Sequence, residues 1–216
     1  MRVYLGSHDG AIVHYWAGKY PDCVGQCFSP PQFKPRAWIP YFLDNGAYKY
    51  FANNKPFDEV AFFTHLRAAK LATKKPVFIV IPDSVGSHSL TSEMWDYFYP
   101  KCLEISADFK YAFVAQDGCK PSSVPKEADW VFIGGTDTFK KPFIKSFASA
   151  FLGRCHVGRV NNIDFVFRCH DLGVTSVDGT GWFRSNHGKP IYSRLEQYFD
   201  HYYGQSLFTQ KSLFAC

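Results

Sequence analysis

The sequence predicts a (β/α)8 barrel built from one domain, residues 1–216, with irregular first units. Short apolar runs alternate with longer segments of helical periodicity along most of the chain. The runs are apolar throughout, which is typical of parallel strands that helices cover on both faces. Seven strands are clear and an eighth is open, so an open doubly wound sheet is the alternative arrangement.

The expected elements follow each other in a regular order. The strands are expected at residues 2–6, 38–43, 76–81, 111–115, 130–133, 155–157 and 174–177. Helices are expected at 57–72, from a capping Thr91 to about Ser106, and at 141–152, 163–172 and 193–203. Residues 11–16 fit either a strand or a short helix, and the proline-rich stretch 19–35 reads as a long loop.

Composition and charge limit the cellular environment and the kinds of partner that we expect for the protein. The formal net charge of +5 is compatible with a polyanionic partner, but it equally fits ordinary solvated surface. No hydrophobic run approaches the length of a transmembrane helix, and the first residues lack a signal-peptide pattern, so we expect a cytoplasmic protein. Phosphate-binding signatures of the Walker or Gly-x-Gly-x-x-Gly type are absent from the sequence.

The seven cysteines are irregularly spaced. Only Cys23 and Cys27 lie close together, and no second pair completes the ligand set of a zinc site. We therefore expect reduced, mostly buried thiols, with no metal and no cofactor.

Polar residues and glycines stand where the expected strands end. They are Asp44, Asp83, Gln116, Gly134, Gly135, Gly158, Arg159 and Asp178. A single Asp after a strand is usually a turn or cap residue, but the carboxyl ends of barrel strands converge on one mouth. Carboxylates, an amide and glycine N–H groups together match the donors and the carbonyl of a guanine-like edge, with Tyr48 available to stack on the ring.

The stretch Asp44-Asn45-Gly46-Ala47-Tyr48 resembles the Asp-Ser-Gly-Gly-Tyr/Phe motif of tRNA-guanine transglycosylases. Further short motifs resemble those of the family in the same order: Pro82-Asp83, Ala115-Gln116-Asp117-Gly118, Ile133-Gly134-Gly135, His156-Val157-Gly158 and Gly173-Val174-Thr175-Ser176-Val177-Asp178. Each motif is short, and only the ordered set is specific.

The resemblance implies a role for each matching residue. Asp178 matches the nucleophile and Asp44 the acid/base. The base-recognition positions are matched by Asp83, Gln116 and Gly135, with Gly134 beside them, Tyr48 over the base and Val157 in the pocket wall. The implied reaction is base exchange at a nucleoside C1′: Asp178 displaces guanine to give a covalent glycosyl-enzyme, and a 7-deazaguanine then takes the vacated position.

The chain also departs from the tRNA enzymes. Their Cys-x-Cys-x-x-Cys plus His zinc site is missing, since only Cys216 follows Asp178. The shorter chain looks most like the DNA 7-deazaguanine transglycosylases of phages and bacterial modification clusters, which insert 7-cyano-7-deazaguanine or a relative. The expected partners are DNA, with its guanine single-stranded or flipped out, and a free 7-deazaguanine base, with no membrane involved. A homodimer is the oligomeric state that the resemblance suggests.

Residues near the last strands are candidates for the DNA contact. Cations that could meet the backbone are Arg159, Arg184, Lys189 and Arg194, and Trp182 and Phe183 could stack or wedge. Such cationic side chains more often lie on the solvated surface without a partner. The histidines at 156 and 187 are likewise more often structural than catalytic. The alternatives are a tRNA-acting relative without the zinc module, a non-catalytic base- or DNA-binding barrel, and a plain N-glycosidase.

Overall fold

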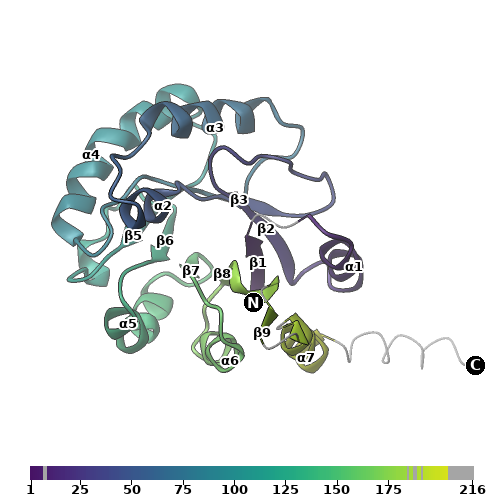
Figure 1. The fold of residues 1–216 in the computed structure, drawn as a ribbon. Helices are drawn as coiled ribbons and strands as arrows, with labels where there is room; N and C mark the ends of the chain where they lie inside the picture. Colours follow the sequence, from purple (N-terminus) through teal and green to yellow (C-terminus); the bar gives the residue numbers. More distant parts are fainter. Residues whose placement is uncertain (7–8, 184, 187–188, 191, 204–216) are drawn as a thin grey trace, which may run out of the picture.

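The computed structural model describes the chain except residues 7–8, 184, 187–188, 191 and 204–216, and within 185–193 it describes backbone only. Eight parallel strands close into a barrel in chain order, with the last strand paired to the first. This confirms the predicted (β/α)8 barrel, and the open sheet is excluded. Helices lie outside the ring of strands (Figure 1).

The barrel strands are β1 (Arg2–Gly6), β2 (Val24–Phe28), β3 (Tyr41–Leu43), β4 (Ile79–Val80), β5 (Tyr111–Ala115), β6 (Trp130–Ile133), β7 (Cys155–Val157) and β8 (Ser176–Gly179). The helices are α1 (Ala11–Lys19), α2 (Ala47–Ala52), α3 (Glu59–Leu71), α4 (His88–Ile105), α5 (Asp137–Ala150), α6 (Ile163–Asp171) and α7 (Tyr192–Tyr203). Short 3₁₀ turns are η1 (Pro121–Ser123) and η2 (Gly181–Phe183), and β9 (Ser185–Asn186) pairs antiparallel with β10 (Lys189–Pro190).

Side-chain alternation along each strand divides the core into two layers. The inner layer fills the barrel and includes Tyr4, Phe42 and Phe78, the last two stacked with ring centroids 4.7 Å apart. The outer layer packs strand residues such as Val3 and Val177 against the helices. Alternate residues of a strand therefore face either the barrel interior, which includes the cavity, or the surrounding helices.

The structure corrects the expected loop at 19–35. Residues Val24–Phe28 form β2, which is buried along its whole length and pairs with β1 on one side and β3 on the other. This strand is hard to predict from the sequence because it contains glycine and glutamine. Gly25 is required by packing, because a Cβ there would lie 2.4 Å from the Tyr4 ring.

Other boundaries also differ from the expectation. Residues 11–16 belong to a helix, α1, and the short helix α2 after β3 was not expected. Helix α4 is capped by Ser87, whose hydroxyl accepts from the Leu90 amide, whereas Thr91 is buried and bonds the Ser84 and Ser87 carbonyls. Helix α5 begins at Asp137 rather than at 141, because Thr136 caps it.

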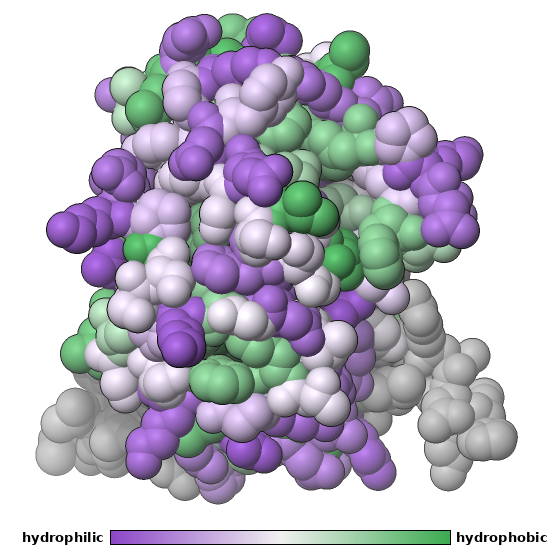
Figure 2. All heavy atoms as spheres, turned by 90° about the vertical axis from the view of Figure 1, so that its left-hand side faces the viewer, coloured by the Kyte–Doolittle hydropathy of each residue, from purple (hydrophilic) through white to green (hydrophobic). Residues whose placement is uncertain are grey.

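The outer face of α4 and α5 mixes hydrophilic and hydrophobic residues (Figure 2). Leu90 and Tyr97 on α4 and Phe143 on α5 are exposed large apolar side chains. In the part of the chain that the structure describes, no helix is both long enough and apolar enough to cross a membrane.

Candidate active site

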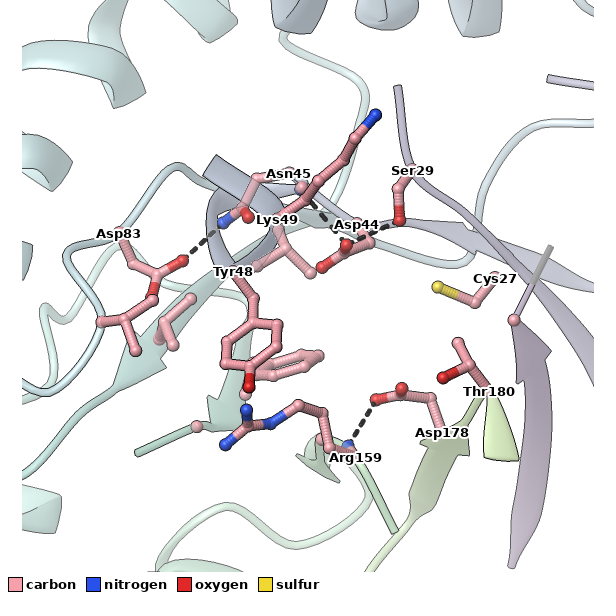
Figure 3. Close-up of a pocket in the computed structure, with 18 of the residues that line it drawn as sticks. Cys27, Ser29, Asp44, Asn45, Tyr48, Lys49, Asp83, Arg159, Asp178 and Thr180 are labelled. Atoms are coloured by element: carbon pink, nitrogen blue, oxygen red, sulfur yellow. Dashed lines mark hydrogen bonds between the residues drawn. The ribbon is translucent and has the colours of Figure 1, made fainter. Parts of the chain in front are cut away.

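A cavity of about 720 Å³ lies at the carboxyl ends of the barrel strands. All eight residues that were expected at one mouth line it: Asp44, Asp83, Gln116, Gly134, Gly135, Gly158, Arg159 and Asp178, and so does Tyr48. Figure 3 shows Asp44, which follows β3, and Asp178, in β8, pointing into the cavity. Closure of the barrel therefore brings these groups together, as expected from their positions at the strand ends.

Asp178 is held by groups on the neighbouring strand β7 and the loop that follows it. Its Oδ1 lies 3.0 Å from His156 Nε2 and accepts the Arg159 backbone N–H at 3.3 Å. Its Oδ2 accepts no hydrogen bond from any residue that the structure describes. The side chain is only 11% exposed. One carboxylate oxygen is thus fixed, and the other is left for a ligand.

His156 lies inside the barrel, below the cavity, and is completely buried. Its ring stacks on Phe132 with centroids 4.7 Å apart, and Nδ1 lies 2.8 Å from Ser176 Oγ. Burial lowers the pKa of the imidazole, although the hydrogen bond to Asp178 acts in the opposite direction. A neutral ring that accepts the Ser176 hydroxyl at Nδ1 donates from Nε2 to the Asp178 carboxylate.

Asp44 has a different environment. Its Oδ2 accepts the Ser29 hydroxyl at 2.7 Å and the Gly46 amide at 3.2 Å, while Oδ1 has no hydrogen-bond partner among the described residues. Burial raises the pKa of Asp44 to about 6, and the negative charges of Asp178 and Asp83 add to that effect. A carboxyl group that titrates this close to neutrality can both give and take a proton.

Asp83 and Gln116 form a fixed hydrogen-bonding pair. Asp83 accepts from Asn45 Nδ2 at 2.7 Å and from Gln116 Nε2 at 2.5 Å, one bond on each carboxylate oxygen. The other end of Gln116 accepts the Gly86 amide at 2.9 Å, which fixes the orientation of its side-chain amide. Burial raises the pKa of Asp83, and its two amide partners oppose that rise.

Two glycines make room beside this pair. A Cβ on Gly134 would lie 2.9 Å from Gln116 Nε2, and its N–H is already donated to the Ala115 carbonyl. Gly135 has φ +73°, and a Cβ there would lie 2.5 Å from Asp117 Oδ2. No described residue accepts the Gly135 N–H, so this amide, and not that of Gly134, is available to a ligand oxygen.

Some expected site residues lie elsewhere. Val157 packs in the core between barrel and helices and does not line the cavity, because the alternation of β7 places His156 inside and its neighbours outside. Trp182 is completely buried in the same core, so it is not available to stack on nucleic acid. Arg194 is exposed on α7 and is not part of the cavity lining.

Other expected residues cannot be placed. Arg184 and His187 lie outside the described residues, and so does Cys216. Lys189 belongs to β10, but its side chain is not among those described. The six cysteines that are described are free and buried.

Four residues of the site were missed or left undecided from sequence. Asn45 orients Asp83, and Ser29 orients Asp44. Lys140 reaches the cavity with a side chain that is 1% exposed and donates to the Gly158 carbonyl at 3.0 Å. For His156 the sequence does contain an indication. It is the polar middle residue of an apolar strand, and Ser176 and Asp178 share one face of the next strand.

Within the ranges that the structure describes, no group of three or more His, Cys, Asp or Glu side chains is arranged to hold a metal ion. What the arrangement offers is a pair of partly free carboxylates, a rigid carboxylate–amide pair, and an aromatic ring, that of Tyr48, at the rim.

No known protein family matches the sequence, and no curated protein does. Among solved structures, a chain of the tryptophan synthase α2β2 complex from the hyperthermophile Pyrococcus furiosus is similar. It is 12% identical, the match covers 84% of this chain and 87% of that chain, and the TM-score is 0.43. A similarity at this level carries no functional argument, so function has to be inferred from the site itself.

Proposed function

We propose that this protein is a glycosyltransferase that exchanges guanine in DNA for a 7-deazaguanine base, such as 7-cyano-7-deazaguanine, through a covalent Asp178 intermediate. The observation that carries the proposal is the pairing of Asp44 and Asp178 in one cavity, each with one oxygen bonded and the other without a described partner. The resemblance of the strand-end motifs to the guanine transglycosylases supports it.

The Asp83–Gln116 pair suits a guanine edge. Each Asp83 oxygen accepts one hydrogen bond and has a lone pair left, which can accept from N1–H and the exocyclic amine of the base. Gln116 Nε2 has a second hydrogen, and the Gly135 N–H is unused, so either can donate to O6. Guanine and 7-deazaguanine present this same edge, which an exchange reaction requires.

In the first step, Asp178 Oδ2 forms a bond to C1′ while the bond from C1′ to N9 breaks. The electron pair of the broken bond leaves with guanine, and Asp44 delivers its proton to N9. The His156 and Arg159 N–H groups hold Oδ1, so the attacking oxygen keeps one direction. A hard substitution is thereby split into two easier ones.

In the second step, the incoming 7-deazaguanine gives its N9 proton to Asp44, and N9 attacks C1′. The bond between C1′ and Asp178 breaks, and its electron pair returns to the carboxylate. Two inversions at C1′ retain the configuration. Atoms and protons balance over the cycle, with Asp44 protonated at the start and at the end.

The substrate must bring its base to the cavity. A volume of about 720 Å³ is in the range of small-molecule sites, so the target guanine has to be flipped out or single-stranded. DNA rather than tRNA is proposed as the substrate on the resemblance of the chain to the DNA-modifying transglycosylases.

The test is incorporation of radiolabelled guanine into single-stranded DNA, duplex DNA and tRNA by the wild-type protein and by Asp178→Asn. We expect label in DNA with the wild type and none with the variant. Label in tRNA alone would select the tRNA-acting alternative. Release of guanine without incorporation would indicate an N-glycosidase. Retained base binding with no exchange by either protein would indicate a non-catalytic binding barrel.

A further inference from the structure

The Arg159 side chain occupies the part of the cavity where a base is expected. Its Nη2 donates to the Gly135 carbonyl at 3.2 Å, and its Cζ lies 4.2 Å from the centroid of the Tyr48 ring. Figure 3 shows Arg159 extending from the β7 side of the cavity toward Tyr48. Both residues that it contacts are ones that the sequence assigns to base recognition.

The backbone of Arg159 is also unusual. Its φ of +56° lies in the left-handed region, which a residue with a Cβ adopts at a cost. In this conformation its N–H reaches Asp178 Oδ1. The residue therefore links the candidate nucleophile, through its backbone, to the base site, through its side chain.

A guanidinium is planar and carries several N–H donors in a fixed arrangement. Guanine and 7-deazaguanine contain the same unit, a carbon bonded to three nitrogens, along the edge that the site is expected to recognise. We propose that Arg159 fills the base subsite of the free protein as a stand-in for the guanidine portion of the purine, and that the incoming base displaces it. This inference rests on the proposed function.

A second cavity gives the displaced side chain a destination. It has a volume of about 530 Å³ and shares Arg159, Asn161 and Asp137 with the first. Lys141 and Arg168 line it as well, beside the acidic Asp137 and Asp164, and Lys141 Nζ lies 3.2 Å from Asp137. Arg159 turned toward Lys141 and Arg168 would form a group of three cations that can meet a phosphate flanking the flipped nucleotide.

The two ligands are therefore expected to respond in opposite ways to loss of Arg159. A free base must displace the guanidinium and gains no phosphate contact in return. A DNA strand displaces the same group but offers it a phosphate. Removing the side chain should therefore strengthen the binding of the free base and weaken the binding of the DNA strand.

The test compares Arg159→Ala with Arg154→Ala as the matched control. Arg154 stands at the opposite end of β7, where it also bonds a backbone carbonyl, that of Ala128, and lies over an aromatic ring, that of Phe151. Binding of free 7-deazaguanine is measured by calorimetry, and binding of a fluorescein-labelled single-stranded DNA by anisotropy at low salt. Thermal unfolding of both variants shows that they are folded.

We expect Arg159→Ala to bind 7-deazaguanine on the order of tenfold more tightly than the wild type, since one cation–π contact and one hydrogen bond no longer compete. It should bind DNA several-fold more weakly, and Arg154→Ala should change neither affinity. Arg159→Lys, which keeps the charge but not the planar group, should follow the alanine variant for the base and the wild type for DNA.

Weaker or unchanged binding of 7-deazaguanine by Arg159→Ala would overturn the inference, because Arg159 would then clamp the base or ignore it. That result would leave the proposed function standing if the wild type still exchanges guanine. Failure of every variant to bind 7-deazaguanine would overturn both.

Discussion

His156 Nε2 lies 3.0 Å from Asp178 Oδ1, and the imidazole that makes this contact is enclosed by the barrel on all sides. Ser176 is its other polar partner. The three side chains form a chain from a hydroxyl through a neutral ring to a carboxylate. They fix Asp178 with its second oxygen toward the cavity, and each link can be tested separately.

Replacing His156 removes the donor that holds Asp178. His156→Phe should slow base exchange about 10- to 100-fold, because it removes a hydrogen bond to a charged group. Affinity for 7-deazaguanine should stay unchanged, because His156 is not part of the cavity lining. Single-turnover exchange and calorimetry measure the two quantities, and His156→Gln, which keeps an N–H donor, should recover part of the rate. An equal fall in rate and affinity would assign His156 a purely structural role.

Ser176→Ala removes the hydroxyl group that lies against Nδ1 of the His156 ring. Without the hydroxyl, the proton can move to Nδ1, which would turn the Nε2 lone pair toward the Asp178 carboxylate. We expect a shift of the His156 ring ¹⁵N resonances and a rate of exchange lower by roughly tenfold. Ser176→Thr retains the hydroxyl and serves as the control. Unchanged ring resonances in Ser176→Ala would show that the hydroxyl does not set the tautomer.

The proposed role of Asp44 makes the first step of the proposed reaction dependent on pH. Its pKa is raised to about 6, chiefly by burial, so its proton is lost as the pH rises through that value. In the proposed reaction guanine departure needs the protonated form, so its single-turnover rate should fall about tenfold per unit above pH 6. Asp44→Asn should be slow and should lack this limb. A limb that persists in Asp44→Asn would assign the titration to another group.

The same raised pKa affects stability. The folded state holds the Asp44 proton up to about pH 6, whereas the unfolded chain releases it near 3.8. Between these values the native state binds more protons, so this group lowers the free energy of unfolding as the pH rises. The unfolding free energy of Asp44→Asn, relative to the wild type, should increase by about 2 to 3 kcal/mol from pH 4 to pH 7. Urea titrations at both pH values measure it, and a constant difference would contradict the raised pKa.

Asp83→Asn tests base recognition. An amide at this position has one acceptor oxygen where the carboxylate has two, and its NH₂ group would face the donors of Asn45 or Gln116. We expect 7-deazaguanine to bind about 10- to 100-fold more weakly, the loss of a hydrogen bond to a charged group. Asp96→Asn, a change at an exposed position on α4, is the control. Equal affinities of the wild type and Asp83→Asn would remove Asp83 from the base site.

Much of this site was predictable because it depends on strand ends. Asp44, Asp83, Gln116 and Asp178 each follow or end an apolar run, and barrel closure brings such positions together whatever the exact strand boundaries are. Arg159 was expected to contact nucleic acid, and its inward direction could not be foreseen, because it depends on a left-handed backbone conformation at a residue that is not glycine.

The predictions that were wrong have separate physical causes. Strand β2 is set by pairing on both sides and not by the propensities of its Gly25 and Gln26. Trp182 is a large ring in a short turn beside the core, and sequence alone does not distinguish it from an exposed stacking residue. Val157 was assigned by a motif, whereas the alternation of β7 gives the inward position to His156.

The most direct measurement is a search for the proposed covalent intermediate on Asp178. Wild-type protein is mixed with a guanine-containing single-stranded DNA without added base, denatured, digested with protease and nuclease, and analysed by mass spectrometry. We expect a peptide in which Asp178 carries a deoxyribosyl group, and no such peptide from Asp178→Asn. Exchange of guanine by the wild type with no adduct on Asp178, or at an undiminished rate in Asp178→Asn, would contradict the proposed mechanism.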